Sequence, residues 1–179
     1  MNADDFSSIA SMEQAAFFGA ACAERAGGVL FWAASGDDRR EDLDRYHEAL
    51  EMLWSPVLDD PSRCSSMWQG LEGMREMRVG AELSGPAAHA LHSVVVVHSA
   101  LRMLVEGPAS AMGERSMAAR NSAFRIEART GRRLLGVEER CQAEGIGGLI
   151  AGEGVDAIRD RARRHGRERM ELLYAHLCR

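Results

Sequence analysis

The chain has 179 residues, of which 46% are hydrophobic and 27% charged, and its formal net charge is −5. This is the size of one globular domain, which buries about two-thirds of the surface of its unfolded chain, so disorder of the whole chain is excluded. All 22 residues of the lysine and arginine class are arginine. Chemistry that needs a lysine amine, such as Schiff-base formation, is therefore excluded as well.

The cysteines and the apolar runs indicate the compartment. The four cysteines contain no C-x-x-C pair, which argues against a zinc ribbon, a redox pair or a disulfide framework; they are Cys22, Cys64, Cys141 and Cys178. The start of the chain is acidic, and the longest aliphatic run, Val94 to Val97, is far shorter than the roughly 18 apolar residues of a membrane span. We expect a soluble cytoplasmic protein with reduced thiols and no membrane segment.

Helical spacing of apolar residues extends through most of the first half. Ser11 and Gln14 match a capping box and predict a helix that ends near Gly27-Gly28. Asp37 and Asp38 then precede a helix that continues to about Trp54. A third helix is predicted from about 62 to 79, with its methionines and Trp68 packed in the core.

A central helix is predicted over residues 84 to 106. Pro86 suits the first turn of a helix, and Val94 to Val97 is apolar all round, which indicates burial on every side. Further helices are expected at about 109–130, from 132 to 141 or slightly beyond, and at about 154–178. The fold class is therefore all-α, a single-domain bundle of six or seven helices around the buried helix 84–106.

Two patterns are typical of ligand sites but lack the residues that such sites need. The glycines at 145, 147 and 148 have no preceding strand and no Gly-Lys-Ser/Thr ending, so they predict a hinge or a helix end rather than a phosphate loop. His89 and His92 are neighbours on the central helix, but no Glu-x-x-His pair accompanies them. We predict no metal and no cofactor, and keep a pocket at His89 and His92 as the site of an alternative enzyme or metal-binding function.

Charge is distributed unevenly along the chain. Residues 1–100 carry 16 acidic and 7 basic side chains, whereas residues 101–179 carry 11 acidic and 15 basic ones. The sequence leaves three uses open for the last helix: its arginines pair with the acidic half of the chain or of a symmetry mate, they contact an acidic partner protein, or they contact nucleic acid. The candidate partner-binding residues are Asp37, Asp38, Glu41, Asp42, Arg159, Arg163, Arg164 and Arg167.

The first third of the chain resembles a known family. Phe17-Phe18 is followed by Ala21-Cys22 and Glu24-Arg25, then by Gly36-Asp37 and by a helix end Leu50-x-x-x-Trp54. This order is similar to that of the YjaG-like family, domain of unknown function 416. The resemblance implies an all-α bacterial cytoplasmic protein and assigns no biochemical role.

The function that we predict from these observations is a non-catalytic protein-binding module, a small acidic protein of the immunity or adaptor kind that acts through charged surfaces. A homodimer is compatible with the charge pattern. The alternatives are an enzyme or metal-binding protein with its pocket at His89 and His92, and a nucleic-acid-associated regulator that uses the helix Arg159–Arg169. Nucleic acid is the less expected partner, because the whole chain is negative and no aromatic residue lies among these arginines.

Overall fold

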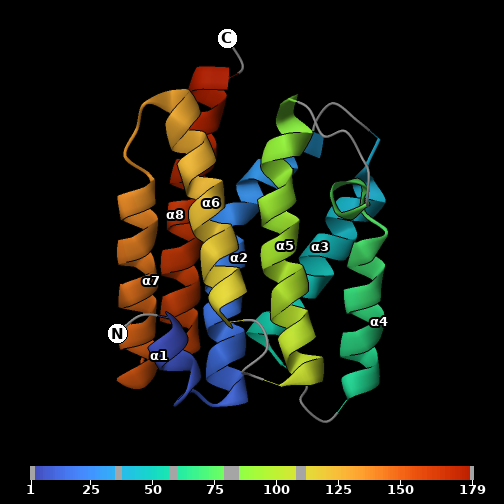
Figure 1. The fold of residues 1–179 in the computed structure, drawn as a ribbon, viewed down its shortest axis with the longest axis vertical. Helices are drawn as coiled ribbons and strands as arrows, with labels where there is room; N and C mark the ends of the chain where they lie inside the picture. The colour runs from blue at the N-terminus through green and yellow to red at the C-terminus, as the bar shows by residue number, and fades with distance from the viewer. Residues whose placement is uncertain (1–2, 35–37, 57–59, 79–84, 108–111, 178–179) are drawn as a thin grey trace.

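The computed structural model describes residues 3–34, 38–56, 60–78, 85–107 and 112–177. Within these ranges the protein is an all-α bundle without strands, as predicted, and its long helices lie side by side (Figure 1). The elements are α1 (Ala3–Ser7), α2 (Met12–Ala34), α3 (Arg40–Trp54), α4 (Pro61–Glu72), the 3-10 helix η1 (Arg75–Met77), α5 (Gly85–Glu106), α6 (Met112–Thr130), α7 (Leu135–Ile150) and α8 (Val155–Leu177).

The short helix α1 is an addition to the predicted elements. Its five residues are too few to show helical spacing of apolar residues, and Phe6 fixes it to the bundle by packing edge-on against Phe18 at a centroid distance of 5.9 Å.

The capping box that begins α2 is confirmed. The backbone N–H of Gln14 donates to Ser11 Oγ at 3.1 Å, and the backbone N–H of Ser11 donates to Gln14 Oε1 at 3.0 Å.

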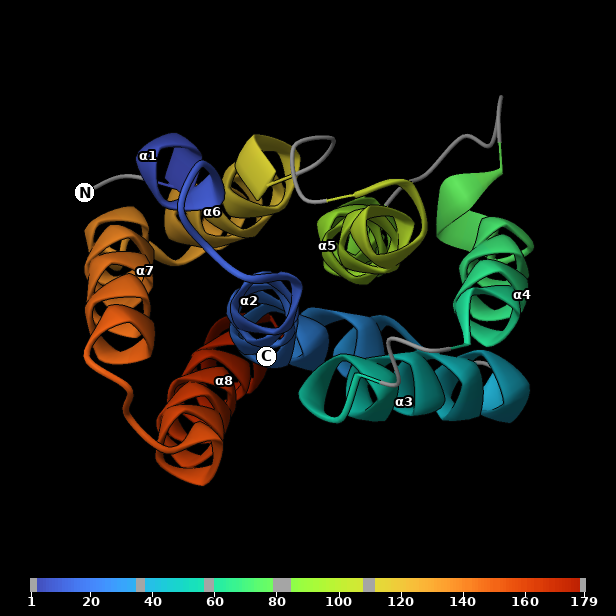
Figure 2. The same cartoon turned by 90° about the horizontal axis from the view of Figure 1, so that it is seen from below.

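The centre of the bundle is shared by α2 and α5. Burial of Val94, Val96 and Val97 confirms that α5 is a core helix. However, α2 packs closely against α3, α5, α6, α7 and α8, and Figure 2 shows it in the middle of the bundle. Small residues make this possible, since a Cβ on Gly19 would lie only 2.8 Å from Ala100 Cβ of α5. The prediction of one central helix over 84–106 is therefore corrected to a central pair.

The predicted helix end at Gly27-Gly28 is wrong, because α2 continues to Ala34. These glycines serve close approach of neighbouring helices. A Cβ on Gly27 would lie 3.1 Å from the Tyr46 hydroxyl, and one on Gly28 would lie 3.0 Å from Met170 Cβ. Gly27 and Gly28 thus provide room for α3 and α8, respectively, within a continuous helix.

The glycines at 145–148 also lie within a helix, where the sequence predicts a hinge or a helix end. The turn after α7 comes later, at Gly152, whose φ of 74° is the left-handed conformation typical of a helix C-terminus. The Glu153 amide donates to the Gly148 carbonyl at 2.9 Å and closes that turn.

The predicted third helix is also shorter than expected, since α4 ends at Glu72 and η1 follows; Val79 lies outside the described residues.

One helix of the described part has the length and apolarity of a membrane span. It is Ala87–Glu106 of α5, with a mean hydropathy of 1.3. Because 56% of this stretch is buried among the other helices, it has the character of a core helix of a soluble protein.

Candidate functional site

The arginines of α8 are mostly directed toward the chain's own carboxylates. Arg159 pairs with Glu51 of α3, and its guanidinium lies 5.7 Å from the centroid of the Trp54 ring. Arg163 lies 3.0 Å from Glu24 and 3.5 Å from Glu51. Pairing with the acidic half of the same chain, one of the uses that the sequence left open, therefore occupies both of these candidate partner-binding residues.

The outer surface of α8 carries more negative than positive groups. Arg161 and Arg169 pair with Glu153 and Glu138, each within 2.8 Å. The charged side chains that α8 leaves exposed are Asp156, Asp160, Arg164, Arg167, Glu168 and Glu171. A helix surface with four carboxylates and two arginines does not present the basic excess that a phosphate backbone requires.

The acidic candidates near the start of α3 have different environments. Asp38 and Glu41 are exposed, whereas Asp42 is half-buried and accepts from Arg39 at 2.8 Å. Arg39 also reaches the buried Glu76 of η1 at 2.7 Å, so Asp42 helps to hold η1 against α3. Asp37 lies outside the described residues.

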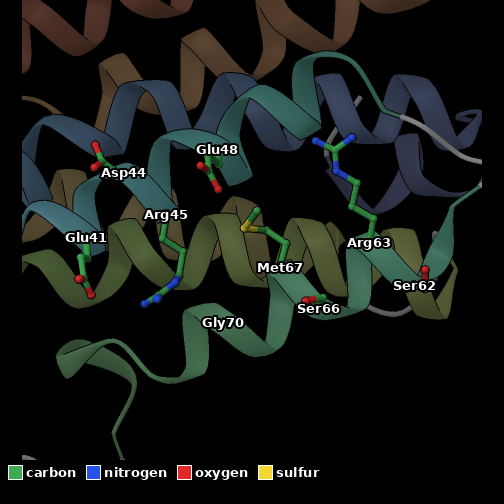
Figure 3. Close-up of a pocket in the computed structure, with 9 residues that line it drawn as sticks. All are labelled: Glu41, Asp44, Arg45, Glu48, Ser62, Arg63, Ser66, Met67 and Gly70. Carbon is green, nitrogen blue, oxygen red and sulfur yellow. The ribbon is translucent and has the colours of Figure 1, made fainter.

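A groove between α3 and α4 encloses a volume of about 680 Å³ (Figure 3). One wall comes from α3 and carries three carboxylates at helical spacing, Glu41, Asp44 and Glu48, together with Arg45. The other wall comes from α4 and is lined by Ser62, Arg63, Ser66, Met67 and Gly70.

Small residues on α4 make the groove wide. Ser62, Ser66 and Gly70 follow one another at intervals of four and therefore lie on one stripe of the helix. Arg45 crosses from α3 toward this stripe, and a Cβ on Gly70 would lie 3.3 Å from its Cδ. Figure 3 shows the Glu48 and Met67 side chains facing each other across the groove. The four-residue spacing of these small residues is visible in the sequence and is the signal by which this wall of the groove could be predicted.

The groove contains carboxylates with no cation of their own. Arg45 lies 3.6 Å from Asp42, and Asp44 lies 3.8 Å from Arg40, so these charges have partners. Glu41 and Glu48 are exposed and form no ion pair with any residue that the structure describes. Exposed, unpaired carboxylates on one wall of an open groove suit a ligand that brings positive charge.

His89 and His92 lie beside arginines of α6. Burial lowers the pKa of both imidazoles, and the charge of Arg125 lowers it further; for His89, Arg129 contributes as well. These neighbours disfavour a second cation at this position. Within the described ranges, no group of three or more histidine, cysteine, aspartate or glutamate side chains is placed to hold a metal ion.

The described thiols are unreactive in this environment. Burial raises the pKa of Cys22 to about 11, and it also raises the pKa of Cys64 and Cys141. A thiol with a raised pKa is protonated at neutral pH and is a poor nucleophile. Cys178 lies outside the described residues.

Comparison of the chain with protein-family models, curated proteins and solved structures finds no match in any of the three. The resemblance of the first third to the YjaG-like family therefore stays a prediction.

Proposed function

We propose that this protein is a non-catalytic protein-binding module that takes a basic segment of its partner in the groove between α3 and α4. The observation that carries the proposal is the carboxylate wall of the groove, in which Glu41 and Glu48 are exposed and form no ion pair with a described residue. The proposal thus assigns the predicted binding function to the acidic half of the chain rather than to the arginines of α8.

The dimensions of the groove suit a peptide backbone. Ser62, Ser66 and Gly70 present almost no side-chain bulk, so a segment lying along α4 comes close to the helix. Arginine or lysine side chains spaced by one helical turn then reach Glu41, Asp44 and Glu48, which recur at the same spacing on α3. The Met67 side chain supplies an apolar contact in the middle of the groove.

The electrostatics suit a small acidic protein of the immunity or adaptor kind, acting in the cytoplasm. Complementary charge accelerates the encounter of two proteins and selects the partner, and it adds less to the final affinity. We therefore expect association with a basic partner to be fast at low salt and to slow down as salt increases. The proposal is compatible with a homodimer whose interface leaves the groove between α3 and α4 open.

The test is capture of the tagged protein's partners from its own cells at low and high salt, with Glu48→Arg beside the natural sequence. We expect one stoichiometric protein to co-purify with the natural sequence at low salt and to be lost with Glu48→Arg. The matched control is Glu171→Arg, which makes the same charge change at an exposed position of α8. A partner that binds the two variants equally well would show that the groove is not the binding site.

A further inference from the structure

The outward face of α6 carries large apolar side chains that are more than half exposed in the described structure. Met117 and Phe124 are 59% and 55% exposed, which places them among the most exposed large hydrophobic residues of the described part. They are seven residues apart, so two helical turns bring them onto one stripe. Asn121 and Ala128 lie on the same stripe and are exposed as well.

The spacing of this stripe is that of a helix that packs along another helix. Met117, Asn121, Phe124 and Ala128 recur at intervals of four, three and four, which is the seam of a two-helix contact. Phenylalanine, methionine and arginine are also enriched at the centres of protein interfaces, whereas lysine, glutamate and aspartate are depleted there. A face with this composition fits a helical ligand better than it fits solvent.

Arginines border the stripe and favour a ligand with negative charge. Between residues 120 and 133 the chain has five arginines and a single acidic residue, Glu127, whose carboxylate accepts from the Leu135 amide. Arg120 pairs with Glu139 at 2.6 Å. The remaining four are exposed and form no ion pair with any described residue: Arg125, Arg129, Arg132 and Arg133.

We propose that this face of α6, defined by Met117, Phe124, Arg125 and Arg129, binds an amphipathic helix with acidic flanks supplied by a second protein. A second copy of the chain is the poorer ligand, because two α6 faces would bring arginine against arginine. The apolar residues of the ligand cover Phe124 and Met117, and its carboxylates reach the arginines in the two-point geometry that guanidinium favours.

This site goes beyond the acidic groove and is independent of it. Figure 2 shows α6 and α4 on either side of α5, so the α6 face and the groove between α3 and α4 lie on helices that α5 separates. The protein then bridges a partner with a basic segment and a partner with an acidic helix, which defines an adaptor.

Two synthetic peptides test the proposal on the whole protein. Both are amphipathic helices of about three heptads with leucine in the seam; one has glutamate at the flanking positions and the other has lysine. We expect the glutamate peptide to bind saturably and to shift the backbone amide resonances of α6. Phe124→Ala should weaken this binding about tenfold, and Arg125→Glu together with Arg129→Glu should abolish it.

The control is Arg164→Glu, an exposed arginine of α8 that forms no ion pair in the described structure. It should leave the affinity for the glutamate peptide unchanged. Absence of binding by the glutamate peptide, or binding that Phe124→Ala and the double reversal leave intact, would overturn the α6 site. The lysine peptide reports separately on the groove between α3 and α4, so failure of either proposal is distinguishable from failure of the other.

Discussion

Glu138 of α7 and Arg25 of α2 form a two-point hydrogen bond in the core, in which Arg25 Nε and Nη2 donate to the carboxylate at 3.0 and 2.9 Å. Arg169 of α8 donates to the same carboxylate at 2.8 Å. All three side chains are buried. The Glu138 carboxylate therefore connects three helices and is the counter-ion of two buried arginines. The stability of the bundle is therefore expected to depend on this residue.

Removal of the Glu138 charge should destabilise the protein strongly. Glu138→Gln leaves two buried guanidinium groups without a counter-ion, and breaking a buried pair in this way costs about 3–5 kcal/mol. Urea unfolding measures the loss. The matched control is Glu139→Gln, which removes the exposed partner of Arg120 and should cost less than about 1 kcal/mol. Equal effects of the two variants would contradict this role of Glu138.

The same carboxylate should make stability fall in acid. Burial alone would raise the pKa of Glu138 above its ordinary value of 4.5. The charges of Arg25 and Arg169 have a larger, opposite effect and lower the pKa to about 2. Because the folded-state pKa is depressed, the stabilisation is fully present above pH 4.5 and is lost as the pH falls toward 2. Urea unfolding at a series of pH values should show a steeper loss for the natural sequence than for Glu138→Gln across this range. Parallel curves would exclude Glu138 as the titrating group.

Arg115 is a buried cation that pairs with no carboxylate of the described residues, and its replacement should stabilise the protein. Its Nη1 lies 2.9 Å from Met103 Sδ, whereas Nε and Nη2 have no hydrogen-bond partner. Burial lowers the pKa of Arg115 to about 10. Substituting a well-packed apolar side chain for a buried charge stabilises proteins by about 1–4 kcal/mol, so Arg115→Met should raise the melting temperature.

A companion variant separates charge from packing at this position. Arg115→Ala also removes the charge but leaves a cavity, so it should be less stable than Arg115→Met. A melting temperature of Arg115→Met below that of the natural sequence would show that the guanidinium contributes to the fold.

Close packing between α2 and α5 should make Gly19 intolerant of a methyl group. A Cβ there would lie 2.8 Å from Ala100 Cβ, and overpacking of this kind costs about 1–3 kcal/mol. Gly147→Ala is the opposite case, because Gly147 is an exposed position of α7 with nothing within 4 Å of the added carbon. Alanine should stabilise α7 there by about 0.5–1 kcal/mol. Thermal unfolding of both variants checks the sign of each effect.

The groove and the α6 face were predictable only in part. The acidic run that supplies Glu41 and Glu48 is visible in the sequence, as are the exposed arginines of α6. Which carboxylates lack a cation was not predictable, because Arg39, Arg159 and Arg163 reach Glu76, Glu51 and Glu24, which come from distant segments, only after folding.

Local chemistry determined the helices. The Ser11 capping box and the all-apolar middle of α5 act within a few residues of chain, so the sequence alone predicted the all-α class. Long-range packing decided what the glycines and arginines do. Gly27 and Gly28 lie within α2 and leave the space that α3 and α8 occupy, instead of ending the helix. Arg169 is buried because it pairs with Glu138 of another helix. Such outcomes depend on distances between segments far apart in the chain, which residue order does not contain.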